Sequence, residues 1–119
     1  MNIIVIGAGY VGLPLAVSFS KHFPVICYDI NKNRIDELNK GYDSNKQHSK
    51  NEIKKKKLSF TNDSNLLIDQ DIYIVTVPTP INSFNHPDLS MLEQASSLVG
   101  KSLKKKSIVI YESTTLPDR

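Results

Sequence analysis

Four short runs of hydrophobic residues set the pattern of this chain. They cover residues 2–6, 25–28, 71–77 and 107–111 and are rich in isoleucine and valine. Unbroken apolar runs such as the first and the third are typical of strands buried on both faces of a parallel sheet. A weaker run at residues 58–60 predicts one further short strand between the second and the third.

After the first run, hydrophobic residues recur at helical spacing. Val11, Leu15 and Phe19 lie on one stripe, which continues to His22, and Ala16 and Phe23 lie beside it. This spacing predicts an amphipathic helix that ends near His22, because Pro24 then separates it from the next run.

A second helix is predicted after the second run. It begins at the N-cap Asn31 and ends at Gly41, and its inner face carries Ile35 and Leu38. Residues 42–57 are polar and rich in lysine. We therefore expect an excursion at the rim of the sheet there, with one short exposed helix.

The last predicted helix begins with a capping box, in which Ser90 caps the helix and Glu93 reaches back to it. Its expected buried face consists of Leu92, Ala95, Val99 and Leu103.

The alternation of strands and helices predicts an α/β fold with one domain over residues 1–119. Right-handed crossovers give a Rossmann-type, doubly wound parallel sheet of strand order 3-2-1-4-5, with helices on both faces. The carboxyl ends of its strands carry residues 7–12, Asp29, residues 77–80 and residues 112–115. Because ligands bind at that edge of such sheets, we expect these segments to form a single functional site.

Residues 7–12 form a G-x-G-x-x-G turn between the first strand and the first helix. Gly7 allows the tight turn, Gly9 lets the backbone approach a pyrophosphate, and Gly12 lets the helix pack closely on the sheet. The free N–H groups and the dipole at the helix start both favour a phosphate. The motif alone is common, but its place between a strand and a helix predicts dinucleotide binding.

Asp29 stands at the carboxyl end of the second strand and completes this pattern. A carboxylate there can accept hydrogen bonds from both hydroxyls of an adenosine ribose, and it would repel a 2′-phosphate. The pattern therefore predicts NAD rather than NADP as the cofactor. The alternative is a structural role for Asp29 as the N-cap of the next helix, for which Asn31 is an equally good residue.

Composition and charge narrow the function classes further. The net charge of +3 comes largely from lysine runs at residues 54–57 and 104–106. No aromatic residues interleave these runs, so they predict a solvated surface rather than a nucleic-acid site. No run is long enough to span a membrane, and we expect neither membrane binding nor a metal site.

The single cysteine, Cys27, excludes an internal disulfide and should be buried in its strand. With a strand at the N-terminus in place of a signal peptide, a cytoplasmic protein is expected.

Three motifs together resemble the UDP-glucose/GDP-mannose dehydrogenase family. They are G-A-G-Y-V-G-L-P-L-A at residues 7–16, V-T-V-P-T-P at residues 75–80 and Y-E-S-T at residues 111–114. The sequence is most similar to the UDP-N-acetyl-hexosamine 6-dehydrogenases of bacterial surface-polysaccharide synthesis, including the Vi-antigen type. The resemblance covers the whole chain, but only the amino-terminal, NAD-binding portion of the family.

The resemblance implies a set of cofactor-binding residues, namely Gly7, Gly9, Tyr10, Val11, Gly12, Asp29, Arg34, Pro78, Thr79, Glu112 and Thr114. In this set the backbone of Tyr10 and Val11 meets the pyrophosphate, and Arg34 lies against the adenosine end. Thr79 contacts NAD from the loop after the fourth strand. Thr114 reaches the nicotinamide side and assists catalysis by helping to order a water. The structural alternatives are a solvated helix residue for Arg34, a turn former for Thr79 and a strand-end cap for Thr114.

Members of this family oxidise the 6-hydroxyl of a nucleotide sugar to a carboxylate in two NAD-dependent steps, through a thioester on a cysteine. Cys27 lies in the wrong strand for that nucleophile, and the catalytic cysteine of the family belongs to a portion that this chain lacks. The resemblance implies a UDP-sugar substrate, most of all a UDP-N-acetyl-hexosamine, and a homodimer for the full-length enzyme. UDP-glucose and GDP-mannose remain possible substrates. This chain alone is expected to bind NAD without oxidising the sugar.

Two other classes stay open from the sequence. One is a stand-alone NAD-binding or regulatory module that pairs with a full-length partner. The other is a different Rossmann enzyme, such as a methyltransferase, although that class usually lacks a glycine at the place of Gly12.

Overall fold

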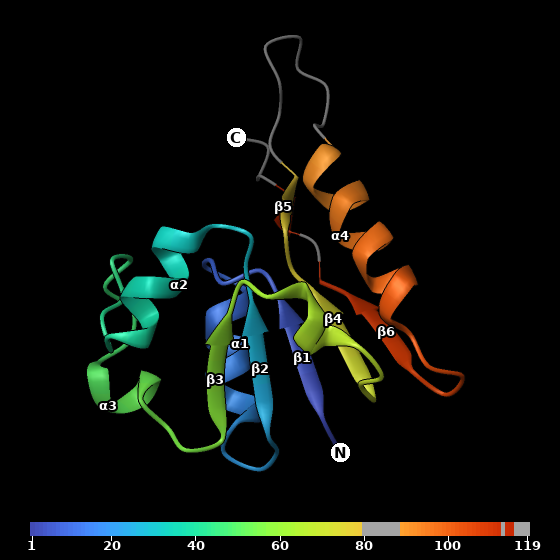
Figure 1. Cartoon of the computed structure of the whole chain (residues 1–119). Helices are drawn as coiled ribbons and strands as arrows, with labels where there is room; N and C mark the ends of the chain where they lie inside the picture. Colours follow the sequence, from blue (N-terminus) through green and yellow to red (C-terminus); the bar gives the residue numbers. More distant parts are fainter. Residues whose placement is uncertain (80–88, 113, 116–119) are drawn as a thin grey trace, which may run out of the picture.

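The computed structural model describes residues 1–79, 89–112 and 114–115. Its centre is a five-stranded sheet in which all pairings are parallel. The strands are β1 (Ile3–Ile6), β2 (Val25–Tyr28), β3 (Leu58–Thr61), β4 (Ile72–Val75) and β6 (Ile108–Tyr111). They lie in the order β3-β2-β1-β4-β6, which confirms the predicted order 3-2-1-4-5 when counted along the chain (Figure 1).

Helices cover both faces of this sheet, as predicted. They are α1 (Gly12–Phe19), α2 (Lys32–Asn39), α3 (Lys50–Ile53), the 3-10 helix η1 (Ser64–Leu67) and α4 (Ser90–Ser102). One hydrophobic cluster joins α1, α2 and α3 to one face of the sheet. A second cluster joins η1 and α4 to the other face. The Rossmann-type architecture is therefore confirmed.

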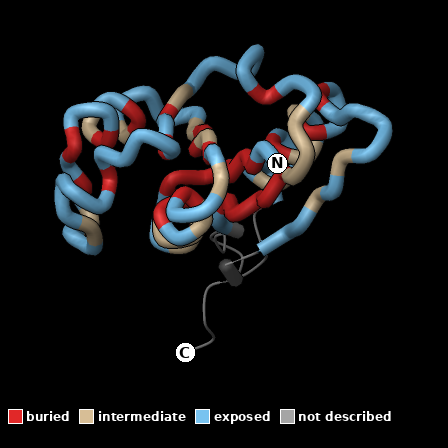
Figure 2. The backbone as a smooth tube through the Cα atoms, turned by 90° about the horizontal axis from the view of Figure 1, so that it is seen from below, coloured by how far each residue is buried: buried red, intermediate tan, exposed pale blue. Residues whose placement is uncertain are grey.

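The central strand β1 shows why its sequence has no polar position. Ile3 and Val5 belong to the cluster on the α1 face, and Ile4 and Ile6 belong to the cluster on the α4 face. All four residues are buried, and Figure 2 shows the buried residues concentrated in the sheet. A strand covered on both faces has no side on which a polar side chain could stay in water.

The edge strand β6 is apolar but much more exposed. Ile108 and Ile110 are 57% and 40% exposed. They pair with Ile72 and Ile74 and therefore lie on the α1 face of the sheet. An apolar run thus identifies the strand, but its burial depends on where the strand lies in the sheet.

Helix α1 ends at Phe19, short of the predicted end near His22. The N–H groups of His22 and Phe23 both donate to the carbonyl oxygen of Phe19, which closes the last turn. Of the predicted stripe, Leu15 and Phe19 pack against the core without being fully buried, and His22 is exposed. The buried side chains are Leu13, Ala16 and Val17, whereas Val11, Leu15 and Phe19 are only half-buried. The reason is that Gly12 packs closely against Gly7 and Thr76, which directs the face of the helix next to Gly12 toward the sheet.

Helix α2 has the predicted ends and the predicted buried face. The side chain of Asn31 accepts a hydrogen bond from the N–H of Arg34 at 3.2 Å, and Ile35 and Leu38 are buried. At the other end Gly41 has a φ of +85°, in the left-handed region. Its N–H donates to the carbonyl oxygen of Leu38, a hydrogen bond that a glycine C-cap typically makes.

The start of α4 differs from the prediction. Its N-cap is Leu89, and Ser90 is the first helical residue. The prediction that Ser90 is the N-cap of a capping box with Glu93 was therefore wrong. Ala95 and Val99 are buried as expected. Leu103 lies beyond the end of the helix and is 41% exposed, because the chain turns there toward β6.

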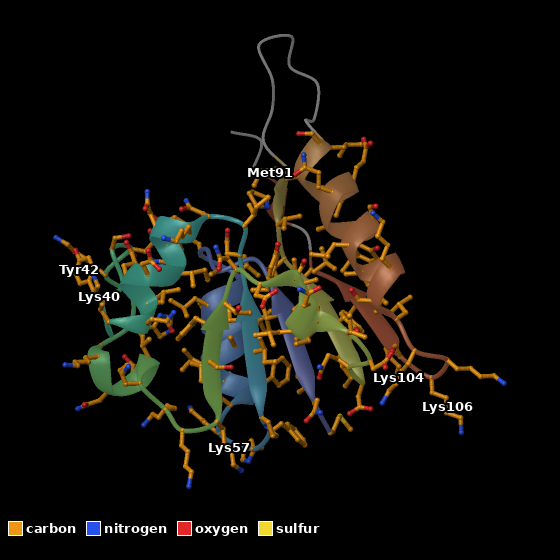
Figure 3. The ribbon with its side chains drawn as sticks, viewed as in Figure 1. Lys40, Tyr42, Lys57, Met91, Lys104 and Lys106 are labelled. Carbon is orange, nitrogen blue, oxygen red and sulfur yellow. The ribbon has the colours of Figure 1, made fainter. Side chains whose placement is uncertain are left out.

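The two lysine runs lie far apart on the surface. All of their residues are exposed. Figure 3 places Lys57 below β3, and Lys104 and Lys106 beyond the foot of β6, all at the amino-terminal edge of the sheet. They therefore form no single basic patch, which fits the interpretation of a solvated surface. Within the described ranges, no helix is long and apolar enough to cross a bilayer.

Candidate functional site

The glycine turn connects β1 to α1 at the carboxyl edge of the sheet. Gly7 has a φ of +109°, which a side chain would strain, and its N–H donates to the carbonyl oxygen of Tyr28 at 2.7 Å. A Cβ on Gly12 would lie 1.7 Å from the carbonyl oxygen of Gly7 and 2.5 Å from Oγ1 of Thr76. Both positions therefore need glycine so that the helix can start against the turn.

The end of this turn, at the start of α1, has backbone N–H groups without a hydrogen-bond partner among the described residues. The N–H groups of Tyr10, Val11 and Gly12 make no hydrogen bond to any residue in the described part of the chain. A Cβ on Gly9 would meet no atom within 4 Å, so the backbone is open to a ligand there. Unpaired N–H groups at the start of a helix bind anions, and an open backbone admits a bulky phosphate. The turn thus fits a pyrophosphate.

Asp29 lies directly behind the glycine turn, after β2. Its Oδ2 accepts a hydrogen bond from the N–H of Ala8 at 2.8 Å, and its Oδ1 accepts one from the N–H of Asn31 at 2.9 Å. The N-cap of α2 is Asn31, so the structure does not use Asp29 as that cap. A carboxylate has about four acceptor positions, and the remaining ones are available to hydroxyl groups of a ligand.

Arg34 holds the backbone of Ala8 at its carbonyl group. Its Nε donates to the carbonyl oxygen of Ala8 at 2.8 Å, and its Nη1 donates to Glu37 at 2.7 Å and to Asp43 at 2.8 Å. The side chain is 10% exposed, so its interpretation as a solvated helix residue was wrong. Burial opposes its charge, but the hydrogen bonds to Asp43 and Glu37 raise the pKa of Arg34 above its usual value.

Asp43 was missed in the sequence because it lies in the polar stretch that was expected to be an excursion. Its carboxylate is fully buried, and it accepts hydrogen bonds from the N–H groups of Asn45, Gln47 and His48 at 3.0–3.1 Å. Burial opposes ionisation, but the hydrogen bonds from Arg34 and from the backbone hold the pKa of Asp43 below its usual value. The available signal was an aspartate shortly after the helix-ending glycine, followed by residues that favour Asx turns.

Thr76 was also missed, although it lies within one of the quoted motifs. Its buried hydroxyl lies 2.9 Å from the carbonyl oxygen of Ile6 and 3.1 Å from that of Gly7, and shares its single hydrogen between these two acceptors. The N–H of Thr76 also donates to the carbonyl oxygen of Ile6 at 2.8 Å. Thr76 thereby attaches the end of β4 to the base of the glycine turn.

The segments after β4 and β6 come together in a second, two-stranded sheet. Strand β5 (Pro78–Thr79) pairs in parallel with β7 (Thr114–Thr115), so that Pro78 lies opposite Thr114. Pro78 begins this short strand, since a strand end tolerates a residue without an N–H. Glu112 is exposed, and its N–H donates to the carbonyl oxygen of Val75 at 2.8 Å. Pro80 lies outside the described residues.

Acid should weaken the fold through Asp43. Since its pKa in the folded state lies below the ordinary value of about 3.9, its charged form stabilises the fold fully above about pH 5 and less as the pH falls. We expect the difference in free energy of unfolding between the wild type and Asp43→Asn to shrink from pH 5 to pH 3, as measured by urea denaturation. His48 faces Asp43, with its Nδ1 3.5 Å from Oδ2 of the carboxylate. A constant difference would contradict this prediction.

Known proteins match this chain over nearly its full length. The model of the UDP-glucose/GDP-mannose dehydrogenase family, NAD binding domain, matches residues 1–119. UDP-N-acetyl-D-glucosamine 6-dehydrogenases of Salmonella typhi and Pseudomonas aeruginosa are 46% and 49% identical over 118 residues, which are 98% of this chain. The chain spans 28% of the length of each of these two relatives. A solved UDP-D-ManNAc dehydrogenase from Pyrococcus horikoshii has a TM-score of 0.88 and 33% identity, over 96% of this chain and 28% of that one.

Proposed function

Because this chain belongs to the UDP-glucose/GDP-mannose dehydrogenase family, as its NAD-binding domain, we propose that the carboxyl edge of its sheet holds NAD for a nucleotide-sugar 6-dehydrogenase. Membership of this family rules out the alternative of a methyltransferase. The stand-alone NAD-binding module differs from this proposal in its partner, but it uses the same cofactor site.

The clamp that Asp29 and Arg34 form on the backbone of Ala8 is the observation that supports this site most strongly. Asp29 accepts from the N–H of Ala8 and Arg34 donates to its carbonyl oxygen, each at 2.8 Å. The two charged groups fix the turn next to the open backbone of Gly9. We assign the pyrophosphate to the N–H groups of Tyr10 and Val11, and the adenosine ribose to Asp29, with Arg34 beside it.

The nicotinamide end is assigned to the second sheet. Pro78, Thr79, Glu112 and Thr114 come from the segments that follow β4 and β6, which are neighbours in the main sheet. In this proposal Thr114 assists catalysis by helping to order a water. The cofactor, when bound, accepts hydride from the substrate, and the protein positions both.

For the whole enzyme we propose oxidation of the 6-hydroxyl of a UDP-N-acetyl-hexosamine to a carboxylate, in two NAD-dependent steps. The names of the most similar relatives support this substrate class. Cys27 cannot be the nucleophile, because it is completely buried and burial raises the pKa of its thiol far above the usual value. In this proposal the catalytic cysteine comes from outside these residues. We also propose that the full-length enzyme is a homodimer. A free, buried cysteine suits the reducing cytoplasm, where we place the protein.

Calorimetric titration with NAD and NADP tests the proposed site. We expect NAD to bind and NADP to bind at least roughly tenfold more weakly, because a 2′-phosphate would approach the carboxylate of Asp29. S-adenosylmethionine, which has no pyrophosphate, serves as the negative control. Failure of NAD to bind, or equal affinity for both dinucleotides, would refute the assignment.

A further inference from the structure

We propose that Asp43 is a positioning residue for the cofactor, which acts by fixing the guanidinium of Arg34 against the glycine turn. The loop of residues 43–48 then belongs to the cofactor site, although it lies outside the sheet edge that the glycine motif defines. This inference rests on the proposed function, because it requires that the Ala8 clamp holds NAD.

The geometry links Asp43 to the turn through a single side chain. Oδ1 of Asp43 accepts from Nη1 of Arg34 at 2.8 Å, and Nε of the same guanidinium donates to Ala8 at 2.8 Å. Because a guanidinium is planar and rigid, fixing one of its edges fixes the direction of the other. The orientation of Arg34 at the turn therefore depends on where Asp43 lies.

The position of Asp43 is itself fixed by its loop. The N–H of Asn45 donates to Oδ1, and the N–H groups of Gln47 and His48 donate to Oδ2. With Arg34, these donors surround a carboxylate whose side chain is 0% exposed. Such charge-assisted hydrogen bonds in a buried place leave the carboxylate no alternative position.

A second connection joins the loop to Arg34. Oε2 of Glu37 accepts from Nη1 of Arg34 at 2.7 Å and from the N–H of Ser44 at 2.9 Å. Glu37 is less buried, with 24% of its side chain exposed. The loop is thus attached to the arginine at two neighbouring residues, Asp43 and Ser44.

Arg34 also carries a sign of a function beyond stability. Its Nη2 is buried and has no hydrogen-bond partner among the described residues. A buried donor without a partner destabilises a fold, so packing alone does not favour this placement. The contacts with Ala8 and Asp43 hold the side chain there, as expected if its orientation serves the ligand.

Two substitutions at Asp43 separate positioning from the shape of the loop. Asp43→Asn keeps an oxygen that can accept from Arg34 and from Asn45. Asp43→Ser keeps a hydroxyl that can accept from Asn45 but does not reach Arg34. Both lose the acceptor for Gln47 and His48, and Asp43→Ser in addition loses the hydrogen bond from Arg34.

The decisive readout is the dissociation constant for NAD, measured by calorimetry. The temperature is chosen so that circular dichroism shows each variant to be folded. We expect Asp43→Ser to weaken NAD binding roughly tenfold and Asp43→Asn to weaken it less. Ser49→Ala, which removes the capping box of α3 without touching Arg34, should leave the affinity unchanged. Equal affinity of the wild type and both Asp43 variants would overturn the inference. If the wild type itself fails to bind NAD, the proposed function fails instead.

A double-mutant cycle shows whether Asp43 acts through the arginine. In an Arg34→Ala background, adding Asp43→Ser should no longer change the affinity for NAD. A persisting tenfold loss would overturn the inference.

Amide hydrogen exchange of the wild type with and without NAD tests the same coupling if the Asp43 variants do not fold. Because coupling between two sites is reciprocal, NAD should slow exchange at Asn45, Gln47 and His48. Exchange at Ser107, at the opposite edge of the sheet, should not change. Unchanged exchange at the three loop amides would overturn the inference.

Discussion

Gly12→Ala should lower the free energy of unfolding by about 3 kcal/mol or more. The new methyl group would lie 1.7 Å from the carbonyl oxygen of Gly7 and 2.5 Å from the hydroxyl of Thr76. The first of these atoms belongs to the backbone of the turn, so the whole start of α1 would have to move away from the sheet. Urea denaturation followed by circular dichroism measures the loss.

Gly100→Ala is the matched control for this substitution. Gly100 lies within α4, and a Cβ there would meet no atom within 4 Å. Because alanine favours helix more than glycine, this variant should gain about 0.5–1 kcal/mol of stability. If Gly12→Ala proved as stable as the wild type, the close packing of α1 on the glycine turn would be wrong.

Asp29→Ala should weaken NAD binding by about 1–3 kcal/mol, which corresponds to roughly 5- to 150-fold in the dissociation constant. The variant removes the acceptor proposed for the ribose hydroxyls. It also leaves the N–H of Ala8 without its partner at 2.8 Å, so the turn loses one side of its clamp. Isothermal calorimetry with NAD gives the change directly.

Asp36→Ala provides the control for the loss of a negative charge near this site. Asp36 lies on α2, and its side chain, which is 51% exposed, forms an exposed ion pair with Lys32 at 3.8 Å, a contact of little energetic value. We expect its dissociation constant for NAD to equal that of the wild type. An unchanged constant for Asp29→Ala as well would remove Asp29 from the site.

The sheet and the glycine turn could be predicted because their signals are local. The apolar runs identify the strands, and right-handed crossovers then leave few possible strand orders. The roles of Gly7 and Gly12 follow from the turn itself, and the structure shows the left-handed φ of the first and the crowding at the second. The ends of α2 could be predicted for the same reason, since Asn31 and Gly41 act within one helical turn.

The residues that support the site could not be predicted, because their partners are distant in the sequence. Thr76 bonds to residues 69 and 70 positions away. Arg34 was expected beside the cofactor, but its attachment to Ala8 and Asp43 depends on how the polar stretch folds back over α2. The pairing of β5 with β7 could not be predicted either, because two-residue strands carry no hydrophobic periodicity.

Hydrogen bonds to both the N–H and the carbonyl oxygen of Ala8 hold the glycine turn in place in the free protein. The chain has already given up the conformational freedom of this turn during folding, before any dinucleotide is present. A ligand therefore makes its contacts without the entropy loss of ordering a mobile loop at that point. Entry of the adenosine half should accordingly resemble rigid docking, with an association rate governed by diffusion and orientation rather than by closure of the turn.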